Sequence, residues 1–189
     1  MSADKFKRLG FDRVFMPMGL DEFVGVERNI KTVDFTGLTV DDKEVKCLLM
    51  DLLDNKPKLS EAMAVTEYQA YFGVKLTRPK PEYDEQGKPK AGFDYWVDGN
   101  KKLDFMYTMH GVNAFKLEKF NQYFAHTDDA WGNQKAEIMR HLDKADIIPL
   151  DLRYLTDENR VKLIDFVLSL TKEQQKQIVL IEGKIDGER

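Results

Sequence analysis

Apolar side chains recur every three or four residues through most of the chain after residue 39, and this spacing constrains the fold more than any other feature. Residues three and four apart lie on one face of an α-helix, so the pattern predicts amphipathic helices. The predicted helices cover 40–54, 61–72, 113–125, about 127–142, 156–170 and a last helix that opens at 171. Residues suited to cap the beginning of a helix stand at these boundaries, namely Thr39, Ser60, Thr127, Thr156 and the Thr171–Gln174 capping box. Gly73 is suited to end the helix 61–72.

One segment alternates instead of following a helical period. Residues 93–109 alternate apolar and polar side chains and predict an antiparallel β-hairpin. Pairing Asp98 with Lys102 leaves a three-residue loop and puts Val97 opposite Leu103, so the apolar side chains share one face. The sequence therefore predicts an α+β protein, mostly helical, in which a helical bundle packs with one hairpin.

The chain divides into an irregular beginning and a single folded domain. Residues 1–38 hold several glycines and Pro17, and are expected to form an arm or a wrap, with one short strand around Val33. Residues 39–189 are expected to form one α+β domain. The segment 77–92, which carries three prolines and two glycines, is expected to be an exposed loop.

Composition excludes several classes of protein. With 42% hydrophobic and 33% charged residues, the 189-residue chain is typical of globular proteins. It has one cysteine, Cys47, and hence no internal disulfide, and it has no 18-residue apolar run or secretory signal. We therefore expect a cytoplasmic protein, in the producing cell or in a host.

The sequence also lacks the common motifs of catalysis. Its 29 basic and 33 acidic residues give a net charge of −4, which argues against nonspecific binding to duplex nucleic acid. It has no glycine-rich phosphate loop, and His110, His126 and His141 are too widely spaced for a local metal site. No cofactor and no metal are expected, and the balance leans against an enzyme.

Two surfaces are candidates for binding a partner. Trp96 and Met106 stand on the polar face of the predicted hairpin among Asp94 and Asp104, where they form a contact surface unless helices cover that face. Cys47 and Met50 form a second strip, opposite the main apolar stripe of helix 40–54. These surfaces predict a non-enzymatic protein–protein interaction module, which would be an adaptor, inhibitor or assembly factor. Its partner would be another protein, with a homo-oligomer left open, and nucleic acid is not expected as a partner.

Two short resemblances bear on function. Residues 29–42 resemble the strand-then-helix openings of small phage tail or head assembly proteins, which implies a viral accessory or structural protein. Residues 177–184 resemble the strand end of metal-dependent nucleases, where a glutamate binds metal and a lysine acts on the water nucleophile. In this chain those positions are Glu182 and Lys184, although the preceding polar run favours a helix and leaves their role undecided.

The alternative function is therefore a protein that acts on nucleic acid. It would be a nuclease of this kind, or a winged-helix-like DNA binder built from helices 40–54 and 61–72 with the hairpin as its wing.

Overall fold

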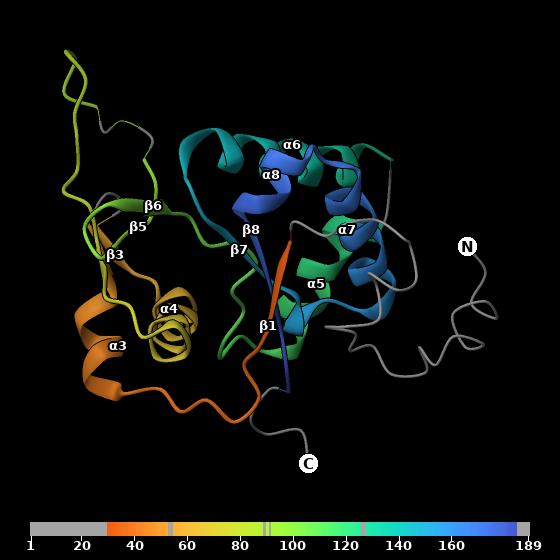
Figure 1. Ribbon diagram of the computed structural model, residues 1–189, viewed down its shortest axis with the longest axis horizontal. Helices are drawn as coiled ribbons and strands as arrows, with labels where there is room; N and C mark the ends of the chain where they lie inside the picture. Colours follow the sequence, from red (N-terminus) through yellow and green to blue (C-terminus); the bar gives the residue numbers. More distant parts are fainter. Residues whose placement is uncertain (1–29, 53–54, 89, 91, 126–127, 185–189) are drawn as a thin grey trace.

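A three-stranded parallel sheet lies at the centre of the computed structural model, which describes residues 30–52, 55–88, 90, 92–125 and 128–184. Its strand order is β1 (Lys31–Asp34), β8 (Ile178–Glu182) and β7 (Ile148–Asp151) (Figure 1). Because all three strands run the same way, their acidic last residues, Asp34, Glu182 and Asp151, lie along one edge.

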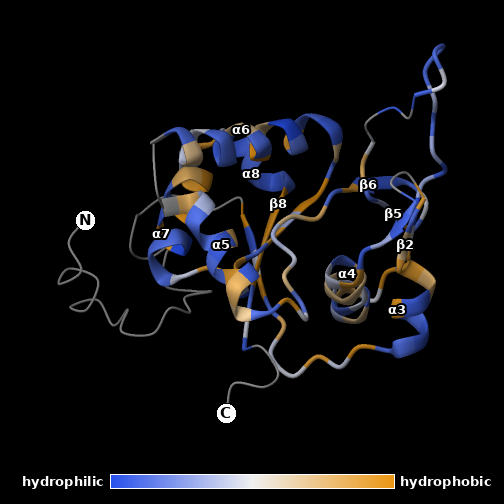
Figure 2. Ribbon diagram, turned by 180° about the vertical axis from the view of Figure 1, so that it is seen from behind, coloured by the Kyte–Doolittle hydropathy of each residue, from blue (hydrophilic) through white to orange (hydrophobic). Residues whose placement is uncertain are grey.

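Helices and small sheets cover the central sheet from two sides (Figures 1 and 2). One lobe contains α5 (Ala114–Ala125), α6 (Asp128–Lys144), the 3₁₀ helix η1 (Leu152–Tyr154), α7 (Asp157–Ser169) and α8 (Lys172–Gln177). The other contains α3 (Asp42–Leu48), β2 (Met50–Asp51), β3 (Lys56–Pro57), α4 (Leu59–Phe72), β4 (Leu76–Thr77), β5 (Tyr95–Val97) and β6 (Lys101–Leu103). In the second lobe β2 pairs with β3, and β4, β5 and β6 form an antiparallel sheet.

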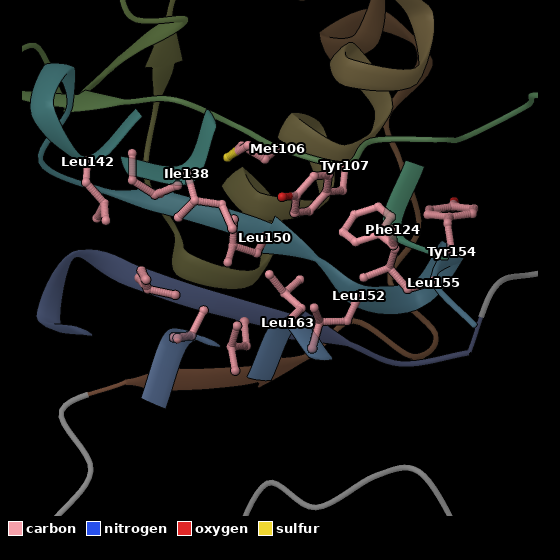
Figure 3. Packing of buried hydrophobic residues seen from close by; sticks show 14 of the residues in the cluster. Met106, Tyr107, Phe124, Ile138, Leu142, Leu150, Leu152, Tyr154, Leu155 and Leu163 are labelled. Atoms are coloured by element: carbon pink, nitrogen blue, oxygen red, sulfur yellow. The ribbon is translucent and has the colours of Figure 1, made fainter. Parts of the chain in front are cut away.

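Strand β8 separates two hydrophobic cores. Its residues alternate between the cores, as side chains of a strand alternate between faces. Ile178 and Leu180 pack with the helical lobe, whose buried residues Figure 3 shows, while Val179 and Ile181 pack with the α3–α4 lobe. The strand is buried along its whole length, which explains its continuous apolar sequence.

The two lobes are also joined by the segment that follows β6. The backbone N–H of Asp104 donates to the Ile147 carbonyl at 3.0 Å, and that of Met106 donates to the Pro149 carbonyl at 2.9 Å. The Met106 carbonyl accepts from Asp151 N at 3.1 Å. This segment therefore extends the sheet beside β7, and Pro149 stands inside that strand rather than breaking the chain.

The α+β class and the predominance of helix are confirmed. Local end signals were predicted well: Thr156 caps α7, Thr171 and Gln174 form the capping box of α8, and Gly73 ends α4 with a φ of 63°. A short strand does precede Thr36, and it joins the sheet as β1 although it falls in the expected arm. Residues 1–29 and the predicted cap Thr127 lie outside the described residues.

Several boundaries differ from the prediction. The first helix ends at Leu48, and Asp41 rather than Thr39 caps it by accepting from Lys43 N. Ser60 lies inside α4, where its hydroxyl donates to the His110 carbonyl at 2.5 Å.

The predicted register of the hairpin is wrong by two residues. Tyr95 faces Leu103, and Val97 faces Lys101. The turn begins at Asp98, which with Gly99 adopts a positive φ, and the Asp98 carboxylate accepts from Lys75 N at 2.8 Å. The strand β6 ends at Leu103, because the following residues pair with β7 instead.

The largest difference concerns residues 178–182, which were expected to continue the last helix. The capping box opens a helix of six residues, and Ile178 then begins β8. The run Ile-Val-Leu-Ile favours a strand that is buried on both faces, and β1 and β7 supply partners on both sides.

No helix in the described part of the chain is long and apolar enough to span a bilayer. The described residues between β4 and β5 form the projecting loop seen in Figure 1, and Tyr83 within it is exposed.

Candidate active site

A cavity of about 530 Å³ lies where the two lobes meet the carboxyl edge of the parallel sheet. Ligands of sheets with parallel strands commonly bind at this edge. The cavity is lined by Phe35, Leu38, Thr39, Val40, Met63, Glu67, Met109, His110, Gly111, Val112, Leu117, Arg153, Tyr154 and Lys184. Elements far apart in the sequence thus contribute its polar side chains.

Arg153 on η1 joins two buried carboxylates. Its Nε and Nη2 atoms donate to Asp151 Oδ1 at 2.9 Å and Oδ2 at 2.8 Å. Its Nη1 and Nη2 atoms donate to Glu67 Oε1 at 3.0 Å and Oε2 at 2.6 Å. Paired contacts of this kind fix the plane of the guanidinium as well as its position. The group also lies 5.4 Å from the ring centre of Phe35, so one wall of the cavity is rigid.

His110 extends this network towards a hydroxyl group. Its Nε2 atom lies 2.9 Å from Glu67 Oε2, and its Nδ1 atom lies 2.5 Å from the Tyr154 hydroxyl oxygen. An ionised carboxylate can only accept, so Nε2–H donates to Glu67 and Nδ1 accepts from the Tyr154 hydroxyl. The result is a hydrogen-bonded chain from a phenol through an imidazole to a carboxylate.

The charge states of these groups follow from their surroundings. Burial alone would raise the pKa of Glu67, but hydrogen bonds from His110 and Arg153 outweigh burial and hold that pKa below its usual value. Burial opposes the charge of Arg153, while Asp151 and Glu67 raise its pKa. Burial raises the pKa of Tyr154. At neutral pH Glu67 is therefore ionised, Arg153 is positive and Tyr154 keeps its proton.

The resemblance to metal-dependent nucleases would imply a divalent cation held by Glu182, at the same edge of the sheet. The carboxylates of Glu67 and Asp151 do not fit a cation, because their oxygens all face the guanidinium of Arg153. Among the described residues, no three His, Cys, Asp or Glu side chains are grouped to hold a metal ion. His126 lies outside that part of the chain.

The hairpin surface predicted to bind a partner is largely covered. Met106 and Asp104 are buried, and Asp94 and Trp96 are half-buried. Helix α6 reaches Asp104 through His141 Nδ1 and Lys144 Nζ, each 2.6 Å from Asp104 Oδ2. Met106 and Asp104 therefore belong to the interior, since the segment that carries them pairs with β7 and packs under α6.

The other predicted residues lie in different places. Cys47 and Met50 are exposed on the α3–α4 lobe and do not line the cavity, so their role in binding a partner stays a prediction. Lys184 lines the cavity at the end of β8. Glu182 is buried at the same strand end but is not among the described residues that line the cavity.

Sequence reasoning missed the network around Arg153. Asp151 and Arg153 follow the apolar run Ile147–Leu150, and an acid at the end of a buried strand could have indicated a site. Pro149 lies inside this strand, and because a proline within an apolar run argues against a strand, it hides β7 in the sequence. Glu67 and His110 offered no local motif, because only the fold brings them together.

Comparison with known proteins gives two relatives. The chain is 28% identical over 134 residues to the tRNA nuclease CdiA of Burkholderia pseudomallei, and the match covers 71% of this chain and 10% of that protein. It also resembles the solved CdiA-CT toxin from Burkholderia pseudomallei E479, which was determined in complex with its cognate CdiI immunity protein. That likeness has a TM-score of 0.53 and 26% identity, and it covers 66% of this chain and 100% of the toxin chain.

These relatives overturn the main functional prediction. A non-enzymatic interaction module, a viral accessory protein, an assembly factor and an inhibitor are all wrong, because the relatives are a nuclease and a toxin. The expectation that nucleic acid is not a partner is wrong for the same reason. The winged-helix alternative also fails, since α4 is buried on several sides and cannot enter a groove.

A family model extends the relation across most of the fold. The model of the CdiA C-terminal tRNase domain matches residues 59–181, about two thirds of the chain. That range contains Glu67, His110, Arg153 and Tyr154, which line the cavity, and Asp151, which bonds to Arg153. The chain belongs to the family of CdiA C-terminal tRNase domains.

Proposed function

We propose that this chain is a nuclease that cleaves RNA of the tRNA class, and that the cavity around Arg153 is its active site. The observation that carries the proposal is the Tyr154–His110–Glu67 chain beside a buried arginine, in a cavity within the matched part of the chain. The Burkholderia relative is a tRNA nuclease, which supports the choice of substrate.

Cleavage of a phosphodiester requires proton transfer at the entering and leaving oxygens, together with positive charge for the phosphate. His110 is the group suited to move the proton, because one imidazole nitrogen can accept a proton while the other donates one. Glu67 fixes the orientation of the ring, as the carboxylate does in hydroxyl–imidazole–carboxylate triads.

Positive charge for the RNA backbone comes from Lys184. Arg153 lines the cavity too, but its carboxylate partners Glu67 and Asp151 offset its charge, so its part is to hold the network in place. Lys184 is exposed at the wall and can follow a phosphate as it enters. Because net charge elsewhere is negative, local charge rather than the overall field attracts RNA to this site.

The proposal is tested by incubating the purified chain with total tRNA, ribosomal RNA and plasmid DNA in a buffer that contains Mg²⁺. We expect tRNA to be cut and DNA to remain intact. Glu67→Gln should lose cleavage while keeping its fold by circular dichroism, and the exposed Glu158→Gln should cut like the original chain. Intact tRNA under all conditions, or equal cleavage by Glu67→Gln, would contradict the proposal.

We further propose that a cognate protein partner neutralises this chain, and that the chain acts in the cytoplasm, where tRNA is found. The support is the solved toxin, which is bound to its immunity protein. Expression of the chain alone in bacteria should arrest growth, whereas expression of Glu67→Gln should not. Normal growth with verified, folded wild-type protein would contradict the toxin role.

A further inference from the structure

We propose that Phe115, Lys119 and Tyr123 on α5 form a strip that docks an unpaired, single-stranded segment of RNA. This inference rests on the proposed function, because it assigns a binding surface to the same substrate. The three residues are four apart, and that spacing places them along one face of a helix.

The strip is exposed and already shows a contact between charge and ring. Phe115 is 62% exposed and Tyr123 is 60% exposed, which is unusual for such large side chains in a folded domain. Lys119 Nζ lies 4.6 Å from the centre of the Phe115 ring. The opposite face of α5 is buried through Phe120 and Phe124, so the helix is held in place without the strip.

Charge on this face favours nucleic acid as the occupant. Lys116 lies beside the strip on the side of Tyr123, so two ammonium groups accompany two rings. Glu118 lies on the other flank, where its Oε1 atom accepts from Gln122 Nε2 at 3.4 Å. Rings that stack on bases and lysines that contact phosphates are the usual components of single-strand binding surfaces.

The strip starts close to the cavity along the chain but faces another side of α5. Val112 and Leu117 line the cavity, whereas Phe115 lies about 160° around the helix from Leu117. Asn113 fixes the first turn of α5 by accepting from Lys116 N at 2.9 Å. The strip would therefore hold a part of the RNA other than the nucleotide that lies in the cavity.

The test measures RNA binding separately from cleavage. In a His110→Gln background, which is expected to be inactive, the dissociation constant for tRNA is measured with and without Phe115→Ala and Tyr123→Ala. We expect the double change to weaken binding at least about tenfold, because each ring stacks on its own base and both stacking contacts are lost. Tyr83→Ala, which removes a 59% exposed tyrosine from the projecting loop, is the matched control and should bind normally.

A second pair of changes tests the charges. Lys116→Ala with Lys119→Ala should weaken binding and reduce the dependence of the dissociation constant on salt, whereas Lys176→Ala should do neither. Unchanged tRNA affinity in both double variants would overturn the docking strip and leave α5 as a surface for a protein partner. If the wild-type chain does not cleave tRNA but both double variants still weaken its binding, the proposed function would be rejected while the docking strip would be supported.

Discussion

At the scale of single residues, Arg153 has a structural role as well as a chemical one. It supplies the positive charge for Glu67 and Asp151, two carboxylates that the fold buries. A buried ion pair adds little stability compared with an apolar group of the same shape, but removing one partner strands the other charge. The contacts that hold the candidate site together therefore also make Arg153 costly to replace.

Arg153→Ala should accordingly lower the free energy of unfolding by about 3–5 kcal/mol, because two buried carboxylates lose their partner. Urea denaturation measures this loss. The exposed Arg140, which pairs with Glu137 on the surface of α6, provides the comparison, and its replacement should cost less than about 1 kcal/mol. Equal effects of the two changes would mean that Arg153 is not holding the carboxylates.

The lowered pKa of Glu67 makes stability depend on pH in one direction. A carboxyl whose folded pKa is depressed contributes stability above its unfolded value, here 4.5, and loses that contribution as pH falls through the folded pKa. Unfolding measured between about pH 3 and pH 7 should therefore show a smaller decline in Glu67→Gln than in the original chain. If the free energy of unfolding falls equally with pH in the two proteins, Glu67 would have the same pKa in the folded and unfolded chain.

At the scale of elements, helix ends could be predicted from the sequence but the central sheet could not. Thr156, Thr171 and Gly73 act on backbone groups within four residues, so their effect is visible locally. Strand β8 exists because β1 and β7 pair with it from distant parts of the chain. The same distance hid the candidate site, of which the sequence indicated only Lys184.

Gly183 follows β8 and packs closely against the turn after β1. It illustrates how this strand depends on contacts with distant parts of the chain. Its φ is 130°, and a Cβ there would lie 2.7 Å from both Asp34 Oδ1 and Thr36 N. Gly183→Ala should therefore lower the free energy of unfolding by about 1–3 kcal/mol. Thermal unfolding would show this loss as a lower melting temperature. Gly132→Ala in α6 meets nothing within 4 Å and should be neutral or stabilising. A harmless Gly183→Ala would contradict this close packing.

The carboxyl pair Asp94 and Asp104 ties the hairpin segment to α6. Burial and the hydrogen bond with Asp104 raise the pKa of Asp94 well above its usual value. Burial would also raise the pKa of Asp104, but bonds from His141 and then Asp94 lower it. Asp94 therefore carries the shared proton, and its contribution to stability falls as pH rises from about 3.8 through its raised pKa.

The substitution Asp94→Asn imitates the protonated acid, and its side-chain oxygen should still accept the hydrogen bond from Phe105 N. We expect Asp94→Asn to be as stable as the original chain near neutral pH, and Asp104→Asn to lose about 3–5 kcal/mol by breaking its bonds to His141 and Lys144. Thermal unfolding of both variants distinguishes them. The reverse order of stability would place the proton on Asp104.

At the scale of the whole molecule, the sheet separates two cores and the candidate site forms at its carboxyl edge. Strand β8 divides two cores, and the cavity opens where α4, η1 and the segment before α5 converge on the carboxyl edge. Each lobe supplies part of the network, Glu67 from one and Arg153 from the other. Substrate that binds there contacts both lobes, so RNA should stabilise the chain as a unit.

The most direct test is the single-turnover rate of tRNA cleavage by His110→Gln, measured together with its affinity for tRNA. We predict a rate at least about 100-fold below that of the original chain, with little change in affinity, because glutamine keeps a polar contact but cannot carry the proton. His141→Gln, which alters a histidine bonded to Asp104 outside the cavity, should cleave normally when folded. Cleavage by His110→Gln at the original rate would contradict the assignment of this cavity as the active site.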